Sequence, residues 1–341
     1  MIRRFISFVL RCRLEDVLAA CVSLALVLLC VTTRLIHSFQ VGFLDVVFIL
    51  LPVGVLGVKT LLGMLSSGTN DEQDSDPTKF VFSFFRPLAK IMRDWFPFVL
   101  LTACYYSLFG NLILRINPNL ADPTLSKIDA AIFGTQPSFL LEPFIRPGIT
   151  DFFSIIYFSH VIVFPGAALY FYVKGEEKPF RRIMMGLLTI MLMGFTSYAL
   201  VPAVGPESYF ASHYTHDLSG QSISRGVDYI IQKGRVSFDC FPSLHVGIPL
   251  LLTFYIRQYR PKWFIPMALY VACMCCATIY LRYHYVIDVI ASFAFAPAAY
   301  FLNDFALSRW PGEKIAVQSV KNKEKVPGAG QGVPGPLEPL S

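Results

Sequence analysis

Long runs of apolar residues alternate with short polar stretches along most of the 341-residue chain. The runs approach the ~20 residues that an α-helix needs to cross a bilayer core. The pattern predicts an all-α fold, a polytopic membrane helical bundle with about eight transmembrane helices. The expected spans cover residues 16–36, 41–64, 95–115, 151–173, 184–203, 243–257, 263–281 and 286–307.

Basic residues gather in every second segment between these spans. They occupy the amino terminus, residues 65–94, 174–183 and 258–262, and the tail after 308. Because cytoplasmic segments of membrane proteins are enriched in Arg and Lys, both termini are expected in the cytoplasm. The loops 116–150 and 204–242 then share the opposite face, and the first is expected to contain a short interfacial helix near 125–133. Long loops on one face often form a substrate mouth.

The same patterns divide the chain into four parts. We expect two N-terminal transmembrane helices over 1–66, a cytoplasmic loop over 67–94, a membrane domain with the candidate chemistry over 95–308, and a cytoplasmic tail over 309–341. The tail is rich in Gly and Pro and cannot bury a core, so it is expected to be disordered.

Composition narrows the class of protein. Hydrophobic residues make up 55% of the chain and charged residues 15%, well below the ~25% charged residues of soluble domains. A net charge of +6 can indicate nucleic-acid binding, but a positive cytoplasmic face explains it better, and no nucleic-acid partner is expected. Most of the eight cysteines fall inside apolar runs, and Cys240 has no obvious partner in its loop. Neither a disulfide framework nor a metal site is predicted.

The first candidate motif is Phe238-Asp239-Cys240-Phe241-Pro242-Ser243-Leu244-His245, which opens the span 243–257. Pro242 suits the first turn of a helix, and the N–H groups that follow are free to bind an anion. Ser243 adds a hydroxyl donor, and His245 adds an acid whose ordinary pKa is close to physiological pH. The alternative reading is a plain helix cap beside an interfacial histidine.

The second candidate motif runs from Tyr280 to Asp288 and joins the last two spans. His284 and Asp288 are spaced i,i+4, so on a helix they share one face. A carboxylate beside one ring nitrogen fixes the tautomer and leaves the other nitrogen free to attack. Arg282 offers a planar fork that suits phosphate oxygens. The alternative is a surface ion pair, although a carboxylate inside an apolar span is costly without a purpose.

The segments PSLH and RYHYVID together resemble the signature of the type 2 phosphatidic acid phosphatase superfamily, and within it the inositol phosphorylceramide synthase-like branch, whose members are inositolphosphotransferases. The chain has Leu244 where the lipid phosphatases have Gly, and Ala277 and Thr278 where they have Ser and Arg. Both departures are typical of the synthase-like branch. The segment 198–206, which ends the fifth span, is also similar to that branch, and the resemblance covers roughly residues 125–300.

The resemblance implies a double displacement without cofactor or metal. His284 would attack phosphorus to form a phosphohistidine while Asp288 holds its ring. His245 would protonate the leaving alcohol and then activate the acceptor. The first-motif Lys and Arg of the lipid phosphatases are missing from their usual place. The candidate phosphate-binding residues are therefore Ser243, Arg282, Arg235 and Lys233.

The expected function is a membrane-embedded phosphotransferase that moves a phosphorylated head group, such as phosphoinositol, between lipids. Its partners would be a phospholipid donor and a lipid or water acceptor. A lipid phosphate or pyrophosphate phosphatase with the same site is the alternative, and a transporter or scaffold is the non-catalytic one. The resemblance implies an integral membrane protein of the cell (inner) membrane with a non-cytoplasmic site, or of the Golgi with a luminal site.

Overall fold

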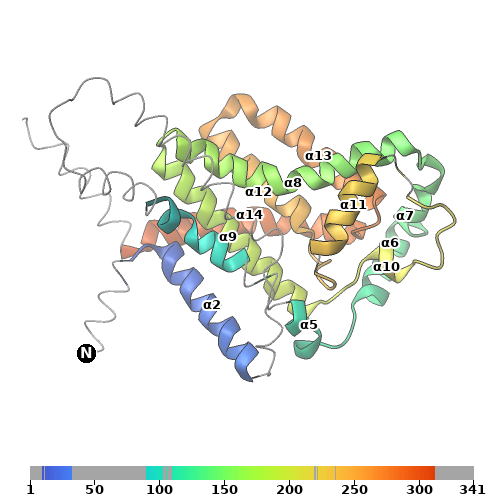
Figure 1. The fold of residues 1–341 in the computed structure, drawn as a ribbon, viewed down its shortest axis with the longest axis horizontal. Helices are drawn as coiled ribbons and strands as arrows, with labels where there is room; N and C mark the ends of the chain where they lie inside the picture. The colour runs from blue at the N-terminus through green and yellow to red at the C-terminus, as the bar shows by residue number, and fades with distance from the viewer. Residues whose placement is uncertain are drawn as a thin grey trace, which may run out of the picture.

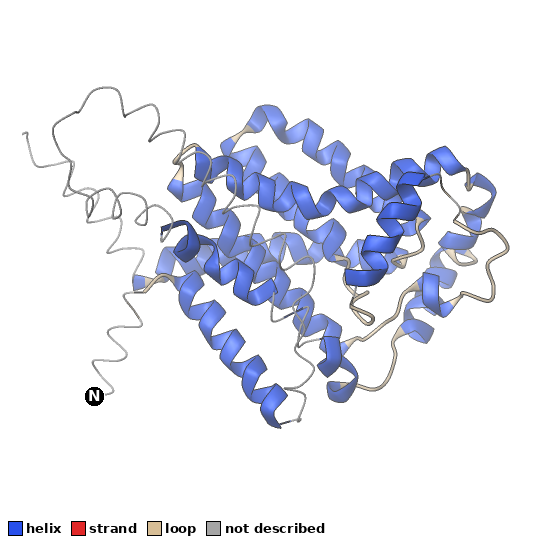
Figure 2. Cartoon of the chain, viewed as in Figure 1, coloured by secondary structure: helices blue, strands red, loops and turns tan. Residues whose placement is uncertain are grey.

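The computed structural model describes residues 10, 12–32, 90–102, 105, 110–218, 220, 222–234 and 236–311. The predicted span 41–64, most of the loop 67–94 and the tail after 311 lie outside the described residues. Within those residues the chain is helical and has no strand (Figure 2), which confirms the all-α prediction for this part. One isolated bridge pairs Ala203 with Asp239.

Long and short helices follow one another along the sequence (Figure 1). In order they are α2 (Leu14–Thr32), a helix over 90–102, α5 (Gly110–Ile116), α6 (Asp122–Phe133), α7 (Pro137–Leu140), α8 (Pro147–Val173), α9 (Glu177–Leu200), α10 (Pro206–Tyr209), α11 (Ser222–Gly234), α12 (Leu244–Tyr259), α13 (Phe264–Tyr280) and α14 (Val286–Arg309). Two 3₁₀ turns, η3 (Glu142–Phe144) and η4 (Pro261–Trp263), precede α8 and α13.

In the described part of the chain, four helical segments are long and apolar enough to cross a membrane. They are α8, α9, η4 with α13, and α14, and they coincide with the predicted spans 151–173, 184–203, 263–281 and 286–307. α9 begins at Glu177, ahead of the predicted start, because the helix continues through polar residues beyond the apolar run. The predicted span 243–257 is α12, whose 16 residues reach only ~24 Å. The count of eight spans and the cytoplasmic termini stay predictions.

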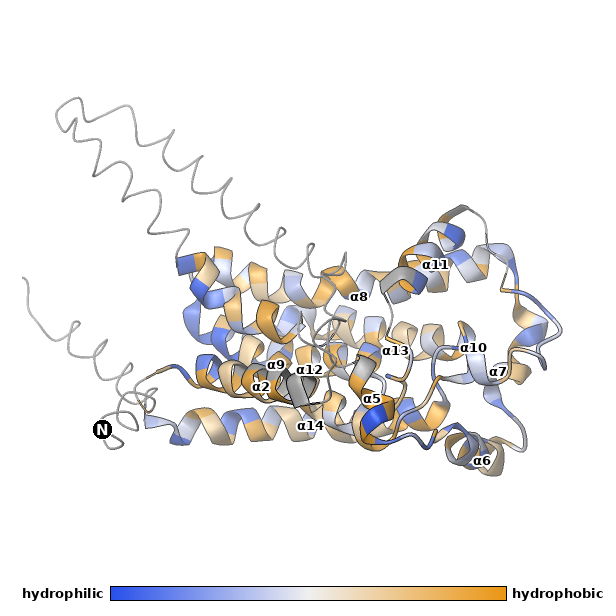
Figure 3. Cartoon of the chain, turned by 60° about the horizontal axis from the view of Figure 1, so that its bottom comes forward, coloured by the Kyte–Doolittle hydropathy of each residue, from blue (hydrophilic) through white to orange (hydrophobic). Residues whose placement is uncertain are grey.

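α12 is the central helix of the bundle and packs against α8, α9, α13 and α14. Small residues allow α9 to approach it closely, since a Cβ added at Gly186 would lie 2.4 Å from the Tyr255 hydroxyl and one at Gly194 2.7 Å from Leu244. Apolar residues predominate along the long helices, and hydrophilic residues concentrate toward their ends (Figure 3). This distribution suits helices that lie in a bilayer.

The short helices α6, α7, α10 and α11 gather at one end of the bundle (Figure 1). They belong to the two long loops 116–150 and 204–242, so the prediction that these loops share one face agrees with the arrangement. α6 also confirms the helix expected near 125–133. The end that these loops occupy is also where α12 and α14 begin, and the two histidine motifs therefore meet there.

Candidate active site

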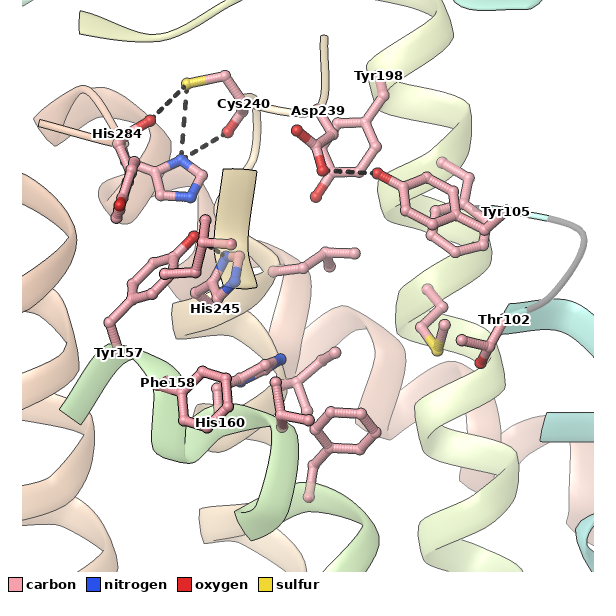
Figure 4. A pocket seen from close by; sticks show the side chains of 18 of the residues that line it. Thr102, Tyr105, Tyr157, Phe158, His160, Tyr198, Asp239, Cys240, His245 and His284 are labelled. Atoms are coloured by element: carbon pink, nitrogen blue, oxygen red, sulfur yellow. Dashed lines mark hydrogen bonds between the residues drawn. The ribbon is translucent and has the colours of Figure 1, made fainter. Parts of the chain in front are cut away.

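His245 and His284 come from different elements and face the same cavity (Figure 4). His245 is the second residue of α12, and His284 lies in the turn between α13 and α14. Their ring centroids are 5.7 Å apart. The cavity encloses about 150 Å³. The structure thus brings together two residues that are 39 positions apart in the sequence.

A tight turn after α13 positions His284. Arg282 adopts a left-handed backbone conformation with φ 66°. The N–H groups of Tyr283 and His284 both donate to the Thr278 carbonyl, at 3.0 and 3.2 Å. These bonds satisfy a carbonyl at the end of the helix and reverse the chain. α14 then begins, and the Tyr285 N–H donates to Asp288 Oδ2 at 2.8 Å in a capping box.

The Nδ1 atom of His284 faces two acceptors. It lies 2.9 Å from the Cys240 carbonyl oxygen and 3.4 Å from Asp288 Oδ2. A ring nitrogen between two acceptors carries the proton, so the lone pair is on Nε2. The His284–Asp288 spacing predicted from the sequence is present, but the nearest acceptor is a backbone carbonyl that no spacing could indicate.

Cys240 joins this pair as a third buried side chain. Its thiol donates to Asp288 Oδ2 at 2.9 Å, and Sγ lies 3.6 Å from His284 Nδ1. Burial, reinforced by the charge of Asp288, raises the pKa of the Cys240 thiol well above its ordinary value, so the thiol stays protonated as a donor. The donor atoms of the three residues lie within 4.8 Å of one another, a spacing that a metal ion can also use. The hydrogen bonds among these three residues explain why their donor atoms lie so close together, and we interpret the cluster as a hydrogen-bonded network.

Two aspartates of α6 hold the start of α14. Asp129 accepts the N–H groups of Val286 and Ile287 at 2.7 and 2.9 Å, two donors that have no intrahelical partner. Asp122 accepts the Tyr285 hydroxyl at 2.9 Å. Burial raises the pKa of Asp129, while these two N–H donors oppose the rise. The sequence analysis missed both residues, although their i,i+7 spacing on one helical face was a usable signal.

The proline-rich segment 198–206, together with Glu207 after it, connects the two motifs. Ala203 bridges to Asp239, beside Cys240, and the N–H of Glu207 donates to the Arg282 carbonyl at 2.7 Å. Gly205 has φ 84°, and a Cβ there would lie 2.6 Å from the Tyr283 carbonyl oxygen. Only glycine fits that backbone and that close approach.

His245 is held between aromatic rings of α8. The Tyr157 ring stacks on it with centroids 4.3 Å apart, and the Tyr157 hydroxyl lies 3.4 Å from His245 Nδ1. His160 lies on the same helix, with its ring centroid 4.8 Å from that of His245. The stacking fixes the plane of the imidazole that begins α12.

The start of α12 differs from the prediction. The helix begins at Leu244 with Ser243 as its N-cap, so Pro242 precedes the first turn instead of occupying it. The Ser243 N–H is also not free for an anion, because it donates to the Asp288 carbonyl at 3.2 Å. The Ser243 hydroxyl is fully buried and has no partner among the described residues. Ser243 does not line the cavity.

Arg282 is engaged away from the cavity. One of its terminal nitrogens donates to Glu142 Oε1 at 3.0 Å and to the His216 carbonyl at 2.7 Å. The guanidinium also lies 3.7 Å from the ring centroid of Tyr214. Although it is two residues from His284, it does not line the cavity. The turn at Arg282 therefore places the His284 side chain in the cavity wall and the Arg282 side chain outside it.

The other two cations predicted to bind phosphate are Lys233 and Arg235. Lys233 belongs to the last turn of α11, and its side chain lies outside the described part of the structure. Arg235 lies outside the described residues. α11 itself contributes Ile230 and Ile231 to the cavity wall, so this helix adjoins the site.

Sequence comparison identifies the family of this site. The model of the PAP2 superfamily matches residues 124–302, just over half of the chain. The chain belongs to the PAP2 superfamily. Phosphoinositol dihydroceramide synthase from Bacteroides thetaiotaomicron is 25% identical over 184 residues, which cover 48% of this chain and 59% of that protein. No solved structure gives a significant match.

Membership of the PAP2 superfamily confirms the resemblance drawn from the two histidine motifs, and the synthase supports the branch. The match contains both histidines, Asp288 and Cys240, and also Asp129 in α6. It therefore includes the PAP2 motifs together with most of the hydrogen-bonded frame that holds them.

Proposed function

We propose that this PAP2 protein is a membrane-embedded lipid phosphotransferase that works through a phosphohistidine on His284. The observation that carries the proposal is the orientation of the His284 ring. Its Nδ1 faces the Cys240 carbonyl and Asp288, which leaves Nε2 as the nucleophile. The neighbouring His245, across the same cavity, is close enough to serve as acid and base for one reacting phosphate.

In the first step Nε2 of His284 attacks the phosphorus of the donor phospholipid. The P–O bond to the lipid alcohol breaks, and His245 gives its proton to the leaving oxygen. The head-group phosphate is then bound to His284. The N–H groups of Leu244 and His245, at the start of α12, stabilise the negative charge that develops on the phosphoryl oxygens.

In the second step the hydroxyl of the acceptor gives its proton to His245 as its oxygen attacks phosphorus. The P–N bond breaks, so both histidines return to their starting states. Asp288 and Cys240 act as positioning residues, because their side chains contact Nδ1 of His284, the ring nitrogen that does not attack. Lys233 and Arg235 remain the candidates for phosphate binding, and we assign Arg282 to holding the turn that carries His284.

The acceptor determines the name of the reaction. The similar synthase is named for phosphoinositol and dihydroceramide, which favours transfer of phosphoinositol from a phospholipid to an alcohol lipid. Apolar side chains from three helices favour a lipid acceptor over water, and they are Phe158, Val161, Phe164, Met191 and Ile248. A lipid phosphatase is the second candidate, because the same two histidines serve either acceptor.

A product assay separates these candidates. The purified protein in phospholipid vesicles would receive labelled phosphatidylinositol, with or without dihydroceramide. A transferase gives a labelled phosphosphingolipid only when dihydroceramide is present. A phosphatase releases water-soluble phosphate product in both samples. If neither sample gives more product than the His284→Ala variant does, the result would support a scaffold or transporter and overturn the proposal.

We also propose that the site opens on the non-cytoplasmic face of the membrane. Ser212 is exposed in the loop 204–242, at the histidine end of the bundle. In right-side-out vesicles a membrane-impermeant thiol reagent should label Ser212→Cys above the background of the native cysteines. Labelling that requires opened vesicles would place the site in the cytoplasm. The same test in Golgi vesicles would distinguish a luminal site.

A further inference from the structure

A third imidazole lies in the cavity beyond the two motif histidines. His160 of α8 is only 8% exposed and lines the same cavity as His245 (Figure 4). Its ring centroid is 4.8 Å from that of His245 on one side and 4.9 Å from that of Phe164 on the other. Neither the sequence motifs nor the proposed double displacement uses this residue.

The hydrogen bonding of His160 is incomplete. Its Nδ1 is buried and has no partner among the described residues. No carboxylate of the described part forms an ion pair with it, which distinguishes it from His284. A buried polar atom without a partner is costly, and such atoms are often completed by a ligand. A ligand bound in the cavity could supply the missing partner of this nitrogen.

We infer that His160 binds the acceptor lipid, an inference that rests on the proposed transferase function. The acceptor hydroxyl must contact His245, which takes its proton. Because the His160 ring lies beside the His245 ring, His160 is next to the part of the acceptor lipid that carries this hydroxyl. The ligand class is an alcohol lipid with a second polar group, an amide or a hydroxyl, close to the reacting hydroxyl. The apolar residues Val161 and Phe164 take its hydrocarbon.

The test pairs a change in His160 with a change in the acceptor. His160→Phe keeps a flat ring and removes both nitrogens, whereas His160→Gln keeps a donor and an acceptor. Dihydroceramide carries an amide and a second hydroxyl, and hexadecanol carries neither. Initial rates of transfer from labelled phosphatidylinositol would be measured for both acceptors in vesicles.

For dihydroceramide, His160→Phe should raise the KM of the acceptor roughly tenfold, the effect of losing one or two hydrogen bonds. The change for hexadecanol should stay within about twofold, and His160→Gln should recover most of the dihydroceramide loss. Release of diacylglycerol in the first turnover should be unchanged. An equal loss with both acceptors, or a slower first turnover, would overturn the inference, because a structural or proton-relay role affects every acceptor.

A matched control uses the neighbouring residue of α8. The Ser159 hydroxyl contacts Tyr270 and not the cavity, so Ser159→Ala should transfer to both acceptors as the wild type does. Thermal unfolding in detergent identifies variants that fail to fold. If the wild type releases no diacylglycerol from the donor at all, the proposed function fails. If it does, and the two acceptors respond alike to His160→Phe, only the role of His160 fails.

Discussion

The Nδ1 atom of His284 lies closer to the backbone carbonyl of Cys240, at 2.9 Å, than to the carboxylate of Asp288, at 3.4 Å. The ring is therefore held by the main chain of one motif and the side chain of the other. Loss of Asp288 leaves the first contact in place. The two motifs consequently act as one unit, and their residues are expected to contribute unequally to the reaction.

Removing the nucleophile should have the largest effect on the reaction. His284→Ala is expected to abolish the phosphoenzyme and turnover, whereas Asp288→Asn should slow turnover by roughly 10²–10⁴-fold. Samples with labelled donor, quenched in alkaline detergent because a P–N bond is labile in acid, would reveal the phosphoenzyme, and thermal unfolding would confirm the fold. A phosphoenzyme of normal amount in His284→Ala would refute the assignment of the nucleophile.

Cys240→Ala removes the thiol that donates to Asp288, and we expect turnover to fall about tenfold. Cys240→Ser retains a donor and should lose less than about threefold. The thiol has a raised pKa, so the stability it provides is complete below its ordinary pKa and is lost as pH rises toward the raised value. Between about pH 8.5 and about pH 10, the Tm of the wild type should therefore fall more steeply than that of Cys240→Ser. Parallel pH profiles would contradict this.

Glu142 ties the loop before α8 to Arg282. Burial favours the neutral acid, but hydrogen bonds from Thr215 and the N–H of His216, with the charge of Arg282, lower the pKa of Glu142 below its ordinary value. Its contribution is present above the ordinary pKa and is lost as pH falls through the lowered one. Glu142→Gln should cost about 1–3 kcal/mol at neutral pH, and its Tm should approach that of the wild type below about pH 4. A constant difference in Tm would exclude the charged contact.

Asp129 accepts two N–H groups at the start of α14, and Asp129→Ala leaves both without an acceptor. We expect Asp129→Ala to lower the stability by about 1–3 kcal/mol. It should also lower turnover more than an equally destabilising substitution far from the site does. Asp129→Asn keeps one acceptor oxygen and should lie between. The control is Asn117→Ala, which removes two exposed hydrogen bonds, one donated to the Leu200 carbonyl and one accepted from the Asn119 N–H. Turnover of Asp129→Ala equal to that of the control would mean that α14 needs no such anchor.

The sequence allowed the helical class, the four long apolar helices and the meeting of the two histidine motifs to be predicted, because each depends on local pattern or spacing. The roles of Cys240 and His160 depend on contacts between segments far apart in the chain, which no local pattern reports. For Arg282 the reverse happened, because the sequence suggested a contact that the structure does not show. Proximity to His284 in sequence suggested proximity to phosphate, but a left-handed turn lies between the two side chains and Arg282 pairs with Glu142.

The aspartates of α6 have a consequence for fragments of this protein. A segment that starts at α8 would contain both histidine motifs and all four long helices, yet it would lack the groups that hold Tyr285 and the first turn of α14. A segment cut at the start of the family match, residue 124, would keep Asp129 and lose Asp122. The smallest segment able to hold His284 in register thus begins at or before Asp122, well ahead of its first long apolar helix.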